Sequence, residues 1–218
     1  SADPKIVSNA KTLEKVSFAE ASELAFFGAK VLHPKTLLPA MSKNIPVRVL
    51  NTFNLEGNGT TILNTVNKTD QIVKSITFKK NVILIHIDST RMLGAYGFLA
   101  KLFAVFDKYN KSVDVVSTSE VSVSLTINDG ENITDIINDL KGIADVEVSK
   151  DKAEICVVGE GMVNAPGILG KTFSVIGKNG INIEMVSQGA SGINHTFIVD
   201  GKDVERAIKV LHEEYFGK

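Results

Sequence analysis

The residues from Ile72 to Phe216 predict one arrangement of secondary structure twice. Each copy contains a strand, a glycine-containing turn, a helix, two strands and a second helix. The first copy then continues into another strand, whereas the sequence after the last helix of the second copy leaves no room for one. An open position beside a packed sheet leaves backbone donors and acceptors unpaired, so another segment should fill it.

The first copy predicts a complete β-α-β-β-α-β unit. An apolar run is followed by a turn at Gly94–Gly97 and then by apolar residues at helical spacing. In chain order, the predicted elements are a strand at 82–87, a helix from 98 to 106, strands at 112–118 and 121–127, a helix from 133 to 140 and a strand at 144–148.

The second copy predicts a strand at 153–158, a turn at Pro166–Gly167, a helix from 168 to 176, strands at 181–187 and 193–199 and a helix from 203 to 215. The spare segment with alternating apolar residues is Ile72–Lys79, which precedes the first copy. We predict that this segment completes the second unit, so that the first unit is inserted within the second. The alternative is that Ile72–Lys79 is a linker.

Composition excludes several classes of protein. The 218 residues are 44% hydrophobic and carry a formal net charge of -1, which argues against a nucleic-acid partner or a polybasic membrane surface. Cys156 is the only cysteine, so no disulfide forms within the chain and a reducing compartment fits. No apolar run reaches the roughly 20 residues that cross a bilayer, and no signal-peptide pattern opens the chain. We therefore expect a cytoplasmic protein.

The first 64 residues have a different character. They predict a helix at 18–25 with a capping box formed by Ser17 and Glu20, a second helix opening at Pro34 and a buried strand at 45–50. Two helices and a strand or two are marginal on their own. We therefore expect this segment to belong to a longer protein.

Several segments resemble motifs of aspartate kinases, and the resemblance covers essentially the whole chain. Four resemble the end of the catalytic domain, at 1–5, 18–21, 27–34 and 45–49, and two resemble signatures of the tandem ACT domains, at 117–122 and 186–191. The resemblance implies an α+β fold: two ferredoxin-like βαββαβ ACT domains, the first inserted into the second, preceded by the C-terminal tail of an amino-acid-kinase α/β domain. The predicted division is 1–64 for the kinase tail, 81–149 for the first ACT domain and 72–80 plus 150–218 for the second.

The resemblance also implies the activity of the parent protein. Aspartate kinases transfer the γ-phosphoryl group of ATP, with Mg, to the β-carboxylate of aspartate. Lys30 resembles the lysine of the family that reaches the nucleotide, although by spacing alone it could equally be a solvated lysine at a helix end. Lys5 stands where many relatives carry arginine, so it keeps the charge but not the bidentate fork. The other substrate motifs have no counterpart, so we expect this chain alone to be inactive, with no catalytic residues and no bound cofactor or metal.

A pattern for an amino-acid ligand lies in the first unit. The turn from Met92 to Leu99 leads into a helix whose free N–H groups can hold a carboxylate. Asp114 and Glu120, on neighbouring predicted strands, suit a ligand with two ammonium groups, namely lysine. The alternative is that both acids lie on a solvated sheet face and the turn only caps the helix.

In lysine-sensitive aspartate kinases the matching residues form the lysine site, at a dimer interface of the first ACT domain. The resemblance thus assigns effector binding to Met92, Gly94, Ala95, Tyr96, Phe98, Leu99, Ser112, Val113, Asp114, Thr118, Ser119 and Glu120. Because Gly94 and Ala95 replace polar residues of some relatives, threonine stays open as the effector. The second unit is expected to carry no acids at matching positions and to pack against the first without binding a ligand.

We therefore predict the regulatory part of a lysine-sensitive aspartate kinase that forms a homodimer. The end of the chain after the second unit favours a monofunctional enzyme over a fusion with homoserine dehydrogenase. The alternatives are a threonine-sensitive aspartate kinase and a free-standing amino-acid sensor. A pure sensor has no use for the kinase-like stretch at 27–34, and a transcriptional regulator is disfavoured because no basic helix-turn-helix pattern is present.

Overall fold

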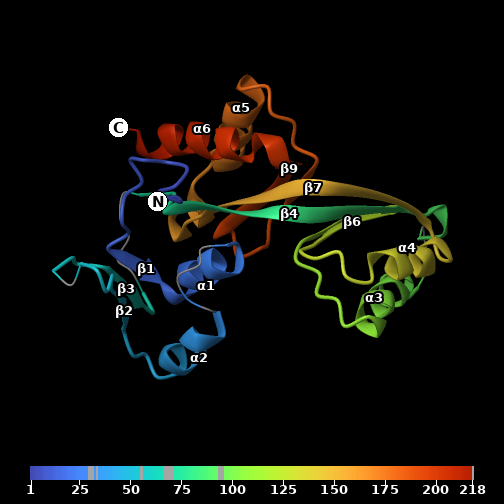
Figure 1. Ribbon diagram of the computed structural model, residues 1–218, viewed down its shortest axis with the longest axis horizontal. Helices are drawn as coiled ribbons and strands as arrows, with labels where there is room; N and C mark the ends of the chain where they lie inside the picture. The colour runs from blue at the N-terminus through green and yellow to red at the C-terminus, as the bar shows by residue number, and fades with distance from the viewer. Residues whose placement is uncertain (29–31, 33, 55, 66–70, 93–95, 218) are drawn as a thin grey trace.

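The structure is a computed structural model that describes residues 1–28, 32, 34–54, 56–65, 71–92 and 96–217 (Figure 1). Its N-terminal segment forms a three-stranded sheet in the order β1-β3-β2, in which β1 is parallel and β2 antiparallel to β3. Two helices accompany this sheet. The elements are β1 (Lys15–Ser17), α1 (Phe18–Phe26), α2 (Pro34–Ser42), β2 (Val47–Val49) and β3 (Thr60–Leu63).

The rest of the chain forms a six-stranded sheet in the order β5-β6-β4-β7-β9-β8, in which all neighbours are antiparallel. The strands are β4 (Ser75–Asp88), β5 (Val116–Thr118), β6 (Ser122–Ile127), β7 (Asp145–Val158), β8 (Met185–Ser187) and β9 (Asn194–Asp200). The helices are η1 (Thr90–Met92), α3 (Phe98–Lys108), α4 (Ile133–Lys141), η2 (Glu160–Asn164), α5 (Ile168–Lys178), η3 (Gly201–Asp203) and α6 (Val204–Phe216).

The two central strands run through both units. β4 and β7 are each 14 residues long and pair with each other from end to end. The sequence predicted two separate strands in each of these regions, and that was wrong. Asn81 adopts a left-handed φ of 61°, and the register between β4 and β7 shifts between Lys79 and Leu84. An asparagine tolerates this conformation, so the chain forms an irregularity in a continuous strand where a break was predicted.

The strand order divides the sheet into two ferredoxin-like units. The C-terminal half of β4 and the N-terminal half of β7 belong with β5 and β6, whereas the other halves belong with β8 and β9. Ser75–Lys79 pairs with Glu154–Val158, and the Lys74 backbone N–H donates to the Val158 carbonyl at 2.8 Å. The predicted pairing is therefore confirmed: this segment is not a linker, and the first unit is inserted within the second.

Two predicted strands are shorter than expected, although Asp114 before β5 and Glu184 before β8 still donate backbone hydrogen bonds to the neighbouring strands. The Val115 N–H donates to the side-chain Oγ1 of Thr126 at 3.1 Å, so β5 begins only at Val116. The Ile181 N–H donates to the Ile176 carbonyl at 3.2 Å beyond the end of α5, and β8 begins at Met185.

Each unit buries its helices against one face of the sheet. α3 and α4 cover the face that carries Ile83, Ile85 and Ile87, and α5 and α6 cover Ile155 and Val157. In Figure 1 the two helix pairs lie on opposite sides of the β4–β7 ribbon. A third cluster joins both units to the N-terminal segment and contains Phe27, Leu84, Val115, Cys156, Val158, Met185 and Ile198.

Helix α1 is fixed to the second unit by several polar contacts. The predicted capping box is confirmed, since Ser17 and Glu20 each bond the backbone N–H of the other at 3.0 Å. Glu20 also accepts a bond from the Glu160 N–H at 2.9 Å, and Thr77 Oγ1 donates to the Phe27 carbonyl at 2.7 Å. These contacts join the kinase-like segment, residues 1–64, directly to the second unit.

Candidate functional site

The segment before α3, together with the first two residues of that helix, contains half of the predicted effector residues. Gly97 ends the turn with a left-handed φ of 75°, and no described side chain caps the helix. Its N-terminal N–H groups therefore lack the side-chain oxygen that usually covers them. Tyr96 is fully exposed, Leu99 is partly exposed, and Phe98 is buried in the core of the first unit. Met92 packs against the same core, whereas Gly94 and Ala95 lie outside the described residues.

The other predicted effector residues flank β5. Ser112 is exposed, and Val113 packs against the core of the first unit. Thr118, the last residue of β5, and Ser119 form hydrogen bonds with Ser122, the first residue of β6. Asp114 thus precedes β5 and the exposed Glu120 follows it. The two acids therefore lie beyond opposite ends of this strand in one chain.

Asp114 is buried and paired with a lysine from the central strand. Only 4% of its side chain is exposed, and its Oδ2 lies 3.5 Å from the Nζ of Lys79 on β4. Burial raises the pKa of Asp114, while the positive charge of Lys79 lowers it. The alternative that both acids lie on a solvated sheet face is therefore wrong for Asp114. Glu120, in contrast, is exposed, as that alternative expects.

The Lys79 ammonium also contacts the end of α1. Its Nζ lies 4.3 Å from the ring centroid of Phe26 and 5.6 Å from that of Phe27. Both distances suit an attraction between the cation and the aromatic faces. The Lys79 ammonium thus contacts Asp114 in the first unit and two aromatic rings, Phe26 and Phe27, in the kinase-like segment.

Glu154 stands directly opposite Lys79 in the β4–β7 pair. It is 1% exposed, and within the described part of the chain neither carboxylate oxygen has a hydrogen-bond partner. Burial raises its pKa to about 7, opposed by Lys79 and assisted by Asp114. Sequence reasoning missed this residue; the available signal was an acid inside the apolar run from Ala153 to Val158.

The second unit carries an acid at the position that matches Asp114, so the expectation of no matching acid was wrong. The Glu184 N–H donates to the Ile198 carbonyl on β9, as the Asp114 N–H donates to the Thr126 carbonyl on β6, both at 2.9 Å. The Glu184 carboxylate pairs closely with Lys152, at 2.7 Å. The position that matches Glu120 is Ala190, so the second unit has one acid where the first has two.

The remaining predicted contacts concern the nucleotide. Lys5 has an exposed side chain, and its backbone N–H donates to Asp3 Oδ1 at 2.8 Å. Lys30 lies outside the described residues. No group of three or more potential ligands of the His, Cys, Asp or Glu type gathers among the residues that the structure covers, and none of the described helices is long and apolar enough to cross a membrane.

Comparisons with known proteins agree with this architecture. Residues 1–51 match the amino acid kinase family, and residues 155–215 match the ACT domain. A solved C-terminal domain of aspartate kinase from Porphyromonas gingivalis, to which a regulatory role is ascribed, is 34% identical, with a TM-score of 0.59; the match covers 67% of this chain and 99% of that domain. The chain belongs to the aspartokinase family.

Aspartokinase relatives match this chain along almost its whole length. Aspartokinase 3, chloroplastic, of Arabidopsis thaliana is 42% identical over 98% of this chain and 40% of its own length. The lysine-sensitive aspartokinase 3 of Escherichia coli is 37% identical over 98% of this chain and 49% of its own length. The chain thus spans about half, or less than half, of the length of these aspartokinases.

Two solved states of E. coli aspartokinase III resemble this chain to different degrees. The TM-score is 0.89 for the R-state complex with aspartate and ADP and 0.83 for the T-state complex with lysine and aspartate. Both are 36% identical and cover 99% of this chain and 49% of theirs. The aspartokinase chain described here is therefore nearer in shape to the R-state structure.

Proposed function

We propose that this chain is the regulatory region of a lysine-sensitive aspartate kinase, joined to the end of the catalytic domain. The parent enzyme would convert ATP and L-aspartate to 4-phospho-L-aspartate, the first step towards the aspartate family of amino acids. The match of 99% of this chain to 49% of E. coli aspartokinase III, solved with lysine and aspartate, supports this role. The match of residues 1–51 to the amino acid kinase family argues against a free-standing sensor.

The proposed division follows the strands. Residues 1–64 end the catalytic domain, residues 81–149 form the first ACT domain, and residues 72–80 with 150–218 form the second. In the parent enzyme, Lys5 and Lys30 would contact the phosphates of ATP, whose charge Mg also neutralises. The exposed side chain of Lys5 is compatible with that contact.

The observation that carries the lysine proposal is the buried Asp114 carboxylate. A buried acid that already holds a lysine ammonium has the chemistry to hold the ammonium of a free lysine. Glu120 offers a second, exposed carboxylate, and the uncapped start of α3 offers N–H groups for the ligand carboxylate. Threonine, with one ammonium group, would leave one of the two acids without a charged partner.

We also propose that two copies pair through the first ACT domain. β5 is the last strand in the order of the six-stranded sheet, where Ser187 Oγ of β8 donates to the Val116 carbonyl at 3.2 Å, and the first unit exposes Tyr96, Leu99 and Val121. Exposed apolar side chains of this kind suit a second copy of the same chain. Such pairing would place the separated Asp114 and Glu120 positions of two chains around a shared interface.

Calorimetric titration of the chain with lysine and with threonine tests the effector. We expect lysine to bind and Asp114→Asn or Glu120→Gln to weaken binding by about 1.5 to 3 kcal/mol, roughly 10- to 150-fold, the range for hydrogen bonds to charged groups. Glu131→Gln, which removes an exposed carboxylate elsewhere in the same unit, is the matched control. Saturating lysine should also raise the melting temperature and favour the dimer in sedimentation. If threonine produces these changes and lysine does not, the assignment of lysine is wrong.

A further inference from the structure

Lys79 presents to Asp114 the same chemical group that a lysine effector would present. Its ammonium is 3.5 Å from the Asp114 carboxylate, at the long limit of a hydrogen bond, and its side chain is 16% exposed. The comparable pair in the second unit, Lys152 with Glu184, is closer, at 2.7 Å. The Asp114 pair is thus a loose contact that a better-placed ammonium can replace.

Glu154 offers Lys79 a second partner. The two residues are directly opposed across β4 and β7, so their Cβ atoms lie about 4.5 to 5.5 Å apart. Both Glu154 oxygens lack a hydrogen bond to any described residue. A change of side-chain rotamer, without movement of the backbone, therefore brings the Lys79 ammonium from one carboxylate to the other.

We propose that Lys79 acts as an internal substitute for the effector, moving from Asp114 to Glu154 when a lysine ligand occupies Asp114 and thereby withdrawing from Phe26 and Phe27. This inference rests on the proposed function of Asp114 in lysine binding. The Lys79 side chain would then couple the effector site directly to the kinase-like segment. The coupling ends at α1, which is tied to the second unit through Glu20 and Phe27.

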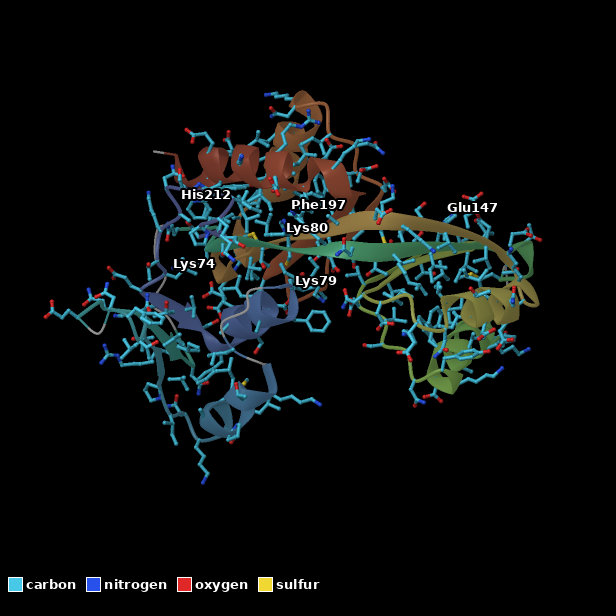
Figure 2. The ribbon with its side chains drawn as sticks, viewed as in Figure 1. Lys74, Lys79, Lys80, Glu147, Phe197 and His212 are labelled. Atoms are coloured by element: carbon cyan, nitrogen blue, oxygen red, sulfur yellow. The ribbon has the colours of Figure 1, made fainter. Side chains whose placement is uncertain are left out.

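The position of Lys79 fits this role, and its neighbour Lys80 does not. Figure 2 labels Lys79 on the α1 side of β4 and Lys80 on the α6 side, where Lys80 pairs with Glu205 at 2.7 Å. Successive residues of a strand point to opposite faces. Lys80 is therefore a matched control that lies one residue away and faces a different partner.

The charge balance of the cluster gives the exchange a measurable signature. In the absence of ligand, one described cation, Lys79, faces the two carboxylates of Asp114 and Glu154, and Glu154 holds its proton up to a pH of about 7. The other groups nearby are the Cys156 thiol on β7, whose pKa burial raises, and Glu23 on α1. A ligand ammonium adds the second cation, so Glu154 ionises as Lys79 reaches it and one proton is released.

Calorimetry in buffers of different ionisation enthalpy measures that proton. Given a pKa of about 7, lysine binding should release about half a proton at pH 7 and nearly one at pH 6. Glu154→Gln should abolish the release and weaken lysine binding about 3- to 10-fold, the worth of one net hydrogen bond. Lys80→Met should behave as the unmodified chain does. Hydrogen exchange should show faster opening of α1 upon lysine addition in the unmodified chain and no change in Glu154→Gln.

The possible results separate the two proposals. If lysine binds and the proton release is absent or unaltered by Glu154→Gln, Lys79 stays on Asp114 and the exchange is refuted, while the effector site stands. If lysine produces no heat and no change in melting temperature, the lysine site itself is refuted and the exchange falls with it.

Discussion

The buried carboxylate of Glu154 should make the stability of the chain depend on pH in an unusual direction. Burial favours the neutral acid and raises its pKa from 4.5 to about 7 in the folded chain. The unfolded chain loses the proton from about pH 4.5 upwards, whereas the folded chain keeps it until about pH 7. Stability from this group is therefore complete at low pH and falls as pH rises between these two values.

The magnitude follows from the pKa difference. A shift from 4.5 to about 7 corresponds to about 3 kcal/mol in total, of which about 2 to 3 kcal/mol is lost between pH 5 and pH 8. Glu154→Gln removes the titrating group and preserves the shape of the side chain. The free energy of unfolding of the variant, relative to the unmodified chain, should therefore rise by that amount over the same interval.

Urea unfolding followed by far-ultraviolet circular dichroism at pH 5, 6, 7 and 8 measures this difference. Glu147→Gln removes an exposed carboxylate from the same strand and controls for the loss of one negative charge (Figure 2). If the difference for Glu154→Gln changes with pH no more than that for Glu147→Gln, Glu154 does not titrate as a buried acid and the reasoning is refuted.

Two further predictions concern glycine positions and catalysis. Gly28→Ala should destabilise the chain by at least about 2 kcal/mol, because Gly28 has a φ of 104° and a Cβ there would lie 2.1 Å from the Phe78 carbonyl oxygen. Gly170→Ala, inside α5 with no atom within 4 Å of the new Cβ, should instead stabilise the chain by about 0.5 to 1 kcal/mol. Equal unfolding midpoints for the two variants would contradict the close approach of Gly28 to Phe78. The chain alone should show no aspartate-dependent ATP consumption, since it spans about half the length of its relatives. Steady turnover by a pure sample in a coupled assay would overturn that expectation.

The fold was predictable from the sequence because apolar periodicity and turn residues recur in both units. The capping box of Ser17 and Glu20 and the pairing of Ser75–Lys79 with the second unit followed from local patterns and from the count of strands. The continuity of β4 was not predictable in this way. Lys79, Lys80 and Asn81 are polar and match a break, and Asn81 is left-handed, but pairing with the distant strand β7 on both sides of this irregularity keeps β4 continuous.

The candidate site was predictable only in part. Asp114 was identified from its place on a predicted strand and from the family resemblance, but its burial was not predicted. Its ion pair is with Lys79, which lies far away in sequence and also contacts Phe26 of α1. Glu154 was missed for the same reason: an acid in an apolar run shows its significance only when its neighbours in space are known.

The insertion of one unit into another also sets the order in which the chain can fold during synthesis. Ser75–Lys79 leaves the ribosome well before its partner strand, because Lys79 and Glu154 differ by 75 positions. At about 5 to 20 residues per second, the wait lasts about 4 to 15 seconds. Throughout that time this strand lacks its neighbour, and the last strand of the first unit, the N-terminal half of β7, is made directly before that neighbour. Lys79 and Lys80 lie at the end of the waiting segment, where positive charge hinders pairing with strands of other chains.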